Sequence, residues 1–555
     1  MRKFFGILLL AWVTIITSTS LTKAEETLKI GISGYPETLH PAFSSSAVQS
    51  YILGFVRRPI MVYNHEWKIA CMMCDTVPSF ENGLAKRVPL KDGKEGVQLS
   101  LSLPENAKWG DGAPLTTKDV AFSIEVGKNE KVAVANKEVY NRIVDFNMID
   151  DHHFTVTMDR IDYSYNAFLG VEILPAHLEK PVYDQDPATY QKRSLYVTAP
   201  DTPGLWFGPY LVKKVITASA VMLEANPYWW GDKPQITSIQ LRNFENTAAL
   251  EASLRAREID YTPGEIGLSI DKVIAFQKRF GDKYDIIYKK GLSYYHLDVN
   301  SAFAPLGDRR VRQALLYAID RDEISQKLFA GKNTPALDFI HPDDPVFTDD
   351  VAHYPFDPAK ADALLNEAGW MRTGTAMRKN DKGDTLHFTL YGATESSTGQ
   401  LIQQVLQNRW KQAGIDVDIL NQPARVLFGE TLPQRKFDGL AIFGWLSAPE
   451  HLPLTILKSD QIPTAENHFE GQNYTGYSNP KVDALIDQIE LELDFNKRVP
   501  LWHELQKIYA TDLPALPLYH GEQGFIFPKW LKGIRPTGHM YPSSLWAEQW
   551  YRTDQ

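Results

Sequence analysis

The chain has 555 residues, of which 44% are hydrophobic, and a formal net charge of −10 at pH 7. This length is enough for about two to four domains with substantial cores. The acidic balance argues against a nucleic acid partner, because phosphate backbones need a basic surface, and against binding to anionic membranes.

The chain begins with the features of a secretory signal peptide. Arg2 and Lys3 make a positive start, a short apolar run follows, and Thr22 and Ala24 are small residues spaced for cleavage after Ala24. The apolar run is too short for a good membrane span, and an uncleaved anchor is the alternative. Removal of residues 1–24, with three positive charges and no acid, takes the net charge from −10 to −13. We expect a mature chain that is exported to the periplasm.

The two cysteines, Cys71 and Cys74, form a CMMC motif. In an exported protein this spacing favours a local disulfide, whose stabilisation is modest because the closed loop is short. A thiol oxidoreductase, or a soft-metal site that includes Met72 and Met73, is the alternative. A redox motif needs a thioredoxin-like context and a closed metal site needs two more ligands, and neither is visible nearby.

The start of the mature chain predicts strands, a turn and a helix. Glu26–Ser33 alternates as a short strand, and Tyr35 stands in the loop after it. Residues 97–103 alternate as another strand. The segment WGDGAPLTTKDVAFSIE is dense in turn residues, and its Thr116 and Asp119 have the spacing of a capping box, with Asp in place of the usual Glu. We interpret this segment as a structural joint without ligand contacts.

The middle of the chain alternates strands and helices, which is typical of an α/β fold. Trp206 stands in an irregular loop, and GPYLVKKV and AVMLEA then predict a hairpin. The elements expected after it are a strand over Gln235–Phe244, a helix over Thr247–Arg257 and a short strand over Ile259–Tyr261.

The stretch Tyr294–Arg321 changes period in its middle. Tyr295, Leu297 and Val299 alternate with polar residues, as in a half-buried strand, and Asp308 then stands where it can cap a helix. The polar face of that helix carries three arginines, at positions 309, 310 and 312. Alone they invite an anion site, but we expect them to serve structure or the surface.

The last part of the chain predicts a β-α-β unit and thus a partly parallel sheet. The helix over Ser397–Ala413 should turn Leu401, Val405 and Trp410 inward. The other elements expected here are strands over Thr385–Tyr391, Ile415–Leu420 and Lys436–Trp445, and helices from Asp357, over about 480–492 and over about 496–510.

The sequence lacks the common local signatures of catalysis. It contains no HExxH, Walker, GxGxxG or GxSxG motif, and its acids and histidines lack metal-ligand spacing. We therefore expect no metal or cofactor, and binding rather than catalysis. A secreted hydrolase whose catalytic group is assembled only by the fold is the alternative from another class.

Seven segments together resemble one family, the family 5 extracellular solute-binding proteins of ABC importers, which bind dipeptides, oligopeptides or nickel. The segments are WGDGAPLTTKDVAFSIE, FGPYLVKK, NPYWWGDKP, REIDY, GDRRVRQALLYAIDRDEI, YPFDPAKADALLNEAGW and LPALPLYH. Each is weak alone, but they stand in family order from about 109 to 520. One departure is Phe207, where the family usually has Thr or Gly.

The resemblance implies an α/β, two-lobed periplasmic-binding-protein fold with a hinge, of the large, three-subdomain type II variety. Residues 25–60, 195–290 and 515–555 would form the first lobe, 61–194 an inserted subdomain and 291–514 the second lobe. Closure would bury a small-molecule or peptide ligand in a monomer and present both lobes to an ABC permease in the inner membrane.

The resemblance also gives candidate ligand contacts. Peptide-binding members have an Asp three residues after the Trp that stands here as Trp445, but this chain has Ala448 there, and Glu450 could substitute as the partner of an amine. Tyr35, Trp206 and Trp445 could stack on a ligand or simply pack, and Arg425 could meet a carboxylate. A peptide is thus the family default. The alternatives are an opine, an oligosaccharide or a chelated metal, and a periplasmic chaperone or sensor on the same scaffold.

Overall fold

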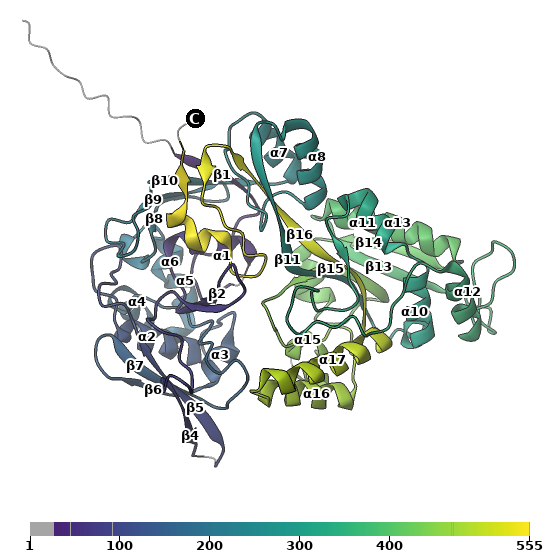
Figure 1. Ribbon diagram of the computed structural model, residues 1–555, viewed down its shortest axis with the longest axis horizontal. Coiled ribbons are helices and arrows are strands. Elements are labelled where there is room, and N and C mark those ends of the chain that lie inside the picture. The colour runs from purple at the N-terminus through teal and green to yellow at the C-terminus, as the bar shows by residue number, and fades with distance from the viewer. Residues whose placement is uncertain (1–26, 45, 92, 468, 470, 554–555) are drawn as a thin grey trace, which may run out of the picture.

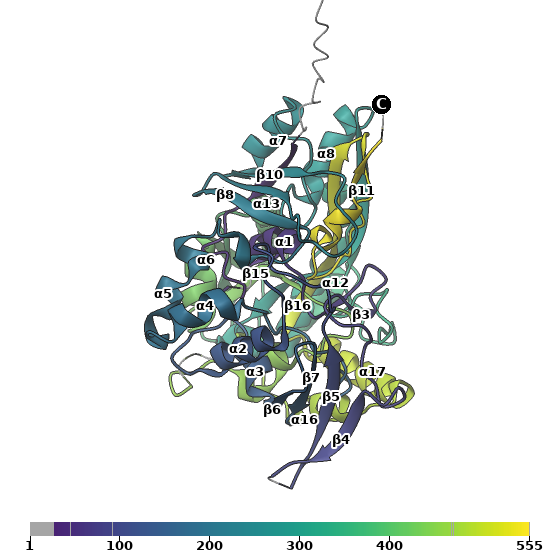
Figure 2. The same cartoon turned by 90° about the vertical axis from the view of Figure 1, so that its left-hand side faces the viewer.

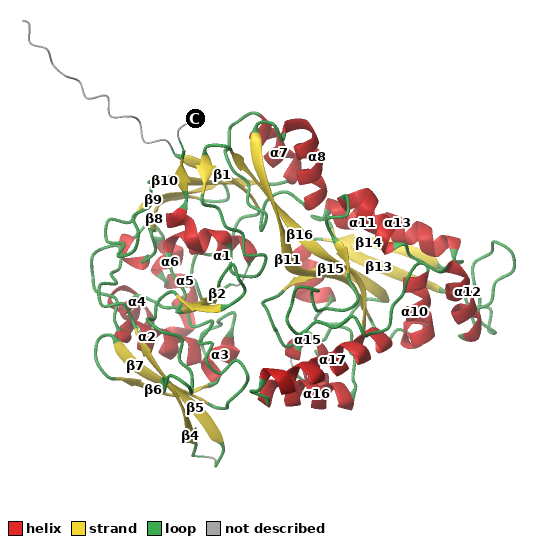
Figure 3. Cartoon of the chain, viewed as in Figure 1, coloured by secondary structure: helices red, strands yellow, loops and turns green. Residues whose placement is uncertain are grey.

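The computed structural model describes residues 27–553 except 45, 92, 468 and 470, so the predicted signal peptide lies outside the described residues. Two bodies lie side by side and are joined by two long strands (Figure 1). Both bodies mix helices with strands (Figure 3). Within the part of the chain that the structure describes, no helix is long and apolar enough to cross a membrane.

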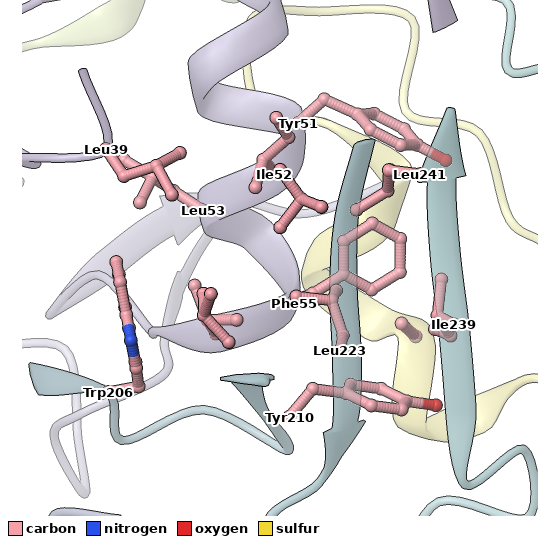
Figure 4. Close-up of a cluster of buried hydrophobic side chains, with 14 of the residues drawn as sticks. Leu39, Tyr51, Ile52, Leu53, Phe55, Trp206, Tyr210, Leu223, Ile239 and Leu241 are labelled. Carbon is pink, nitrogen blue, oxygen red and sulfur yellow. The ribbon is translucent and has the colours of Figure 1, made fainter. Parts of the chain in front are cut away.

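The first lobe is built on a four-stranded sheet in the order β1-β10-β9-β8, in which β1 and β10 are parallel. Its core is made by helix α1, whose Tyr51, Ile52, Phe55 and Val56 are fully buried, together with side chains from the sheet (Figure 4). The elements are β1 (Leu28–Ser33), α1 (Ala47–Val56), α6 (Leu195–Thr198), β8 (Tyr210–Ile216), β9 (Ala220–Ala225), β10 (Ser238–Phe244), α7 (Thr247–Arg255), α8 (Ile270–Phe280), β17 (Leu531–Lys532) and β18 (Tyr551–Arg552). Helices α4 (Ala176–Tyr183) and α5 (Tyr190–Arg193) also pack into this core through Tyr183 and Tyr190, although the predicted bounds assigned them to the inserted subdomain.

The inserted subdomain has an antiparallel sheet in the order β4-β5-β7-β6, which projects at one end of the molecule (Figure 2). The predicted capping box is present, since the Asp119 carboxylate accepts from Thr116 N at 2.8 Å. Cys71 and Cys74 form a disulfide beside the small β2–β3 pair. The elements are β2 (Met61–Tyr63), β3 (Ile69–Cys71), β4 (Ala85–Pro89), β5 (Glu95–Ser102), α2 (Thr117–Lys128), α3 (Lys137–Asn141), β6 (Ile143–Met148) and β7 (His153–Met158).

The second lobe is built on a six-stranded mixed sheet in the order β12-β16-β11-β15-β13-β14. The predicted β-α-β unit is present as β13, α13 and β14, with β13 parallel to both β14 and β15. The elements are β11 (Tyr284–Val299), α9 (Ala304–Gly307), α10 (Arg309–Tyr317), α11 (Arg321–Phe329), β12 (Thr334–Pro335), α12 (Pro358–Glu367), β13 (His387–Ala393), α13 (Ser397–Gln412), β14 (Asp416–Gln422), α14 (Ala424–Val426), β15 (Gly439–Leu446), α15 (Leu454–Leu457), α16 (Pro480–Leu491), α17 (Phe495–Asp512) and β16 (Ala515–Pro528).

The junction between β11 and α10 forms as predicted, and its arginines serve structure. The Asp308 side chain accepts from Arg310 N and caps α10. Arg312 donates to the carbonyl of Asp512 at 2.6 Å, which satisfies a carbonyl at the end of α17. Arg310 pairs with Asp308 at the surface. Arg309 lies 3.6 Å from the Asp512 carboxylate, so all three arginines make the structural or surface contacts that were expected of them.

Strands β11 and β16 connect the two bodies. They pair antiparallel from Tyr284 opposite Pro528 to Asp298 opposite Ala515, with an irregularity between Lys290 and Ser293. The predicted boundary between residues 290 and 291 falls at this irregularity. The boundary predicted at 515 falls at the start of β16, whose first residues pair within the large sheet.

A buried polar layer lies between the large sheet and α17. Asp338 is fully buried there: its Oδ1 accepts from Ile340 N at 2.7 Å, and its Oδ2 has no hydrogen-bond donor among the described residues. Burial raises the pKa of Asp338 to about 8. In the same layer the Tyr294 and Tyr509 hydroxyls share a hydrogen bond of 2.9 Å.

Replacing Asp338 with asparagine should remove a pH-dependent loss of stability. Because the folded-state pKa is raised, the folded protein keeps a proton that the unfolded chain has released, and stability falls as pH rises from about 4 to about 8. The advantage of Asp338→Asn over the wild type should therefore grow by about 1.4 kcal/mol per pH unit across this window, to a gain of about 5 kcal/mol at pH 8 relative to pH 4. Urea unfolding at pH 5 and pH 8 measures it, and a difference independent of pH would contradict the assignment.

Candidate ligand-binding site

Strands β13 and β15 are parallel neighbours that pair briefly and then diverge. Thr389–Tyr391 of β13 pair with Gly439–Ala441 of β15, and β13 then continues only beside β14. Residues 442–446 of β15 keep β11 on one edge, with Tyr295 opposite Gly444. Among the described residues no strand pairs with their other edge. Divergence at the carboxyl ends of parallel strands is a common place for a ligand crevice.

A cavity of about 470 Å³ lies at this divergence. The second lobe contributes the ends of β13 and β15 and the start of α13, while the first lobe contributes Thr247 and the segment Gly264–Ile270. Beside the cavity, Thr398 Oγ1 of α13 donates to Asp271 Oδ1 of α8 at 2.9 Å. The cavity therefore lies between the two lobes, and its size is in the range of small-molecule sites.

Aromatic rings line the cavity on the face of the large sheet. Tyr295 of β11 stacks on Tyr519 of β16, with 4.9 Å between ring centroids. A Cβ atom on Gly444 or on Gly521 would come within 3.0 Å of the Tyr295 ring, so glycine in both flanking strands gives the ring its place. Tyr295 remains 37% exposed, and Phe329, Phe428 and Phe443 also line the cavity. These rings offer a ligand flat apolar contacts.

The polar lining is rich in hydrogen-bond acceptors. It includes three acids and three amides: Glu265, Glu395, Glu522, Asn333, Gln403 and Gln523. Burial raises the pKa of the Glu265 and Glu522 carboxyl groups. The described residues that line the cavity include no Lys, Arg, His or Cys. The lining thus supplies acceptors and hydroxyls, and among the described residues no group of three or more His, Cys, Asp or Glu side chains could hold a metal ion.

Comparison with known sequences decides the family. The model of the family described as "Bacterial extracellular solute-binding proteins, family 5 Middle" matches residues 80–456. The chain belongs to this family. The solute-binding protein is 26% identical over 494 residues to Protein XP55 of Streptomyces lividans, covering 88% of this chain and 83% of that one. It is 23% identical over 543 residues to the dipeptide-binding protein of Escherichia coli, covering 93% and 94%.

Solved structures confirm the fold predicted for this solute-binding protein. The oligopeptide-binding protein of Thermus thermophilus complexed with a pentapeptide aligns with a TM-score of 0.80 at 26% identity, covering 95% of this chain and 96% of that one. NikZ of Campylobacter jejuni in complex with Ni(L-His) aligns with a TM-score of 0.77 at 21% identity, covering 95% and 100%. The chain has the two-lobed α/β fold of the type II periplasmic binding proteins.

None of the six residues predicted to contact the ligand of the solute-binding protein lines the 470 Å³ cavity. Trp206 is fully buried in the first-lobe core, where its Nε1 donates to Pro200 O at 2.9 Å (Figure 4). Tyr35 packs against the same core, and Arg425 is exposed in α14. For Trp206, burial leaves no surface for a ligand, so the structure places it as a packing residue.

The loop after β15 is occupied by contacts within the protein. Trp445 stacks on Tyr474 and lines a separate void of about 20 Å³, and Ala448 is buried beside another void of about 20 Å³. Glu450 Oε2 lies 3.0 Å from Arg498 Nη2, so its carboxylate already has a cationic partner. An amine at Glu450 stays a prediction, and it would have to compete with this ion pair.

The residues that do line the cavity were missed for a common reason. Tyr295 belongs to the alternating stripe with Leu297 and Val299, and a large aromatic at the end of such a stripe is a usable signal. Gly444 and Gly521 make room for the Tyr295 ring only because β15 and β16 pair with β11. This pairing is not visible in the local sequence. Gln403 is a fully buried polar residue on a helix, and no local pattern singles it out.

Proposed function

We propose that this protein captures a peptide or peptide-like solute in the cavity between its lobes and delivers it to an ABC permease in the inner membrane. The observation that carries the proposal is the unpaired edge of β15 at residues 442–446, which borders the cavity. An extended peptide can add to such an edge through main-chain hydrogen bonds, while alternate side chains enter pockets. The Thermus thermophilus protein complexed with a pentapeptide supports this ligand class.

Other ligands fit the cavity less well. NikZ is described in complex with Ni(L-His), but the cavity lining described here offers no histidine or cysteine to a metal complex. An opine or an oligosaccharide has no extended peptide main chain to pair with the open edge of β15, so this edge favours a peptide over both. A hydrolase would need a base beside one of the lining serines, and a chaperone or sensor would not need delivery to a permease. We therefore propose a binding protein without enzymatic activity.

Calorimetry and mass spectrometry with short peptides test this function. Tri- to pentapeptides should bind the purified protein with one site per chain and be recovered intact after prolonged incubation. Steady cleavage of the peptides would support the hydrolase. Saturable binding of sugars or metal complexes, without binding of peptides, would show that the ligand is not a peptide.

Contacts between the inserted subdomain and the second lobe should hold the closed state. Tyr163 Oη donates to Glu450 O at 2.5 Å, and Tyr163 N donates to Glu490 O at 2.9 Å. The guanidinium of Arg498 lies 4.6 Å from the centre of the Tyr163 ring, and Arg160 pairs with Glu490 at 3.0 Å. If these contacts form on closure, they add to ligand affinity, because they stabilise the state that binds.

Removing the Tyr163 hydroxyl should weaken binding without unfolding the protein. Tyr163→Phe keeps the ring over Arg498 but loses the bond to Glu450 O, which is worth about 0.5–1.5 kcal/mol. We expect the Kd for a bound peptide to rise about threefold to tenfold. Calorimetry measures this, with Tyr551→Phe, at an exposed ring, as the control. An unchanged Kd would show that these contacts do not depend on closure.

We further propose that the mature protein is a periplasmic monomer, cleaved after Ala24. The family description as extracellular supports export. The intact mass of protein from an osmotic-shock fraction should correspond to a chain that begins at Glu25, and gel filtration should give the mass of one chain.

A further inference from the structure

Four side-chain oxygens at the cavity are buried and lack a hydrogen-bond donor among the described residues. They are Glu265 Oε2, Gln403 Oε1, Glu522 Oε2 and Gln523 Oε1. Gln403 is fully buried, and its Nε2 donates to Leu390 O at 3.1 Å, which fixes Oε1 as the unpaired atom. Buried acceptors are normally satisfied, so four at one cavity point to a ligand that brings donors.

The charges around the cavity are negative. The lining carries Glu265, Glu395 and Glu522 and no cationic side chain within the described part of the chain. Asp271 adjoins it, bonded to Thr398. The Nζ of Lys332 lies 4.0 Å from Glu522 Oε2, which is too far for a hydrogen bond. A positive ligand group is therefore favoured over a negative one.

Some of these acceptors are already used within the protein. Glu395 accepts from Ala424 N through both oxygens, and Glu265 Oε1 accepts from Ser543 N. Within the described part of the chain, no donor reaches Glu522 Oε2, although the backbone N of Glu522 donates to Asn333 Oδ1. Glu522 is thus the carboxylate of the lining with the most unused acceptor capacity.

Tyr295 adds a second feature that suits a cation. One face of its ring stacks on Tyr519, and 37% of the residue remains exposed beside the cavity. The face of an aromatic ring attracts an ammonium or guanidinium group, more strongly where water is excluded.

We propose that the lining of this cavity selects ligands through a positively charged group, an ammonium or a guanidinium, received by the Glu522 carboxylate on the β16 side of the cavity. The inference rests on the proposed function, since the ligand must enter this cavity. It assigns charge recognition to Glu522 of β16, and not to the loop at Ala448 and Glu450, where the family resemblance implies it. The cation has two sources in a peptide, the amino terminus or a basic side chain.

Four tripeptides distinguish these sources by calorimetry at pH 7. They are Ala-Lys-Ala, its analogue with norleucine in place of lysine, and the amino-acetylated form of each. The acetylated norleucine peptide carries no positive charge, so it should bind at least about tenfold more weakly than Ala-Lys-Ala. Retained affinity of acetylated Ala-Lys-Ala assigns the cavity to the side chain, and retained affinity of the free norleucine peptide assigns it to the amino terminus.

Equal binding of all four peptides would overturn the inference and leave the proposed function standing. Binding of none of them, or of any other short peptide, would overturn the proposed function and the inference with it.

The protein-side test is Glu522→Gln, which keeps the shape of the side chain and removes its charge. Affinity for Ala-Lys-Ala should fall at least about tenfold, while affinity for the acetylated norleucine peptide should stay within about twofold. Glu105→Gln, at an exposed position outside the cavity lining, is the matched control. An equal loss for charged and uncharged peptides would mean that Glu522 acts only through structure, and would overturn the assignment.

Discussion

Replacing Trp206 with alanine is expected to lower the free energy of unfolding by about 3–5 kcal/mol and to leave ligand affinity unchanged in the protein that stays folded. The indole is fully buried, packs edge-on against Tyr196 with 5.1 Å between ring centroids, and donates its N–H to Pro200 O. Its removal leaves a cavity in a core built from α1 and the first-lobe sheet, and an unpaired carbonyl (Figure 4).

Denaturant unfolding and calorimetry on the same sample measure both quantities for Trp206→Ala. Trp229→Ala, at a partly exposed indole, is the control and should cost less stability. The sequence interpretation of Trp206 as a ligand contact predicts the opposite pattern, with near-native stability and weakened binding.

Replacing Gly444 with valine is expected to weaken peptide binding by about 100-fold or more. A Cβ atom at this position would lie 3.0 Å from Cε1 of Tyr295, so the ring must move, and the branched side chain would occupy space beside the strand edge at residues 442–446. Two effects would lower the affinity together: the Tyr295 ring is displaced from its contact with the ligand, and the peptide can no longer pair with the strand edge. A factor of 100 corresponds to about 2.7 kcal/mol, within what overpacking and a lost contact together can cost.

Gly307→Val is the control for Gly444→Val, because an added Cβ at Gly307 meets no atom closer than 3.5 Å. Thermal unfolding of both variants separates loss of fold from loss of the site. Wild-type affinity in a folded Gly444→Val protein would show that the ligand does not use this edge.

Local sequence patterns predicted the elements whose partners are near in the chain. The strand before Asp308, the helix after it and the Thr116–Asp119 capping box all formed where their residues indicated. Each depends on interactions within a few residues. The resemblance of seven ordered segments predicted the family and the fold.

The buried face of α13 was predicted correctly at Trp410, but it was one residue out of phase at the start of the helix. Leu401 was predicted to face inward but is 42% exposed, whereas Ile402, Leu406 and Trp410 are buried. These three are spaced by four residues, so they form one face of the helix. A stripe through Leu401, Val405 and Trp410 was equally compatible with the pattern, and only packing against the sheet distinguishes them.

The candidate site could not be predicted in this way, because its residues meet only in the folded chain. Tyr295, Gly444 and Gly521 come from three strands that are far apart in sequence and adjacent in the sheet. The ion pair of Glu450 was also not foreseen, because its partner Arg498 stands 48 residues further along the chain. Charge pairing between such distant residues leaves no local signal.

A crystal structure of the protein with bound Ala-Lys-Ala tests the central claim most directly. The account predicts a peptide between β13 and β15, with its main chain hydrogen-bonded to residues 442–446 and a cationic group within hydrogen-bond distance of Glu522. A peptide held instead at the loop of Ala448 and Glu450, with the Glu450–Arg498 pair opened and residues 442–446 unoccupied, would contradict it.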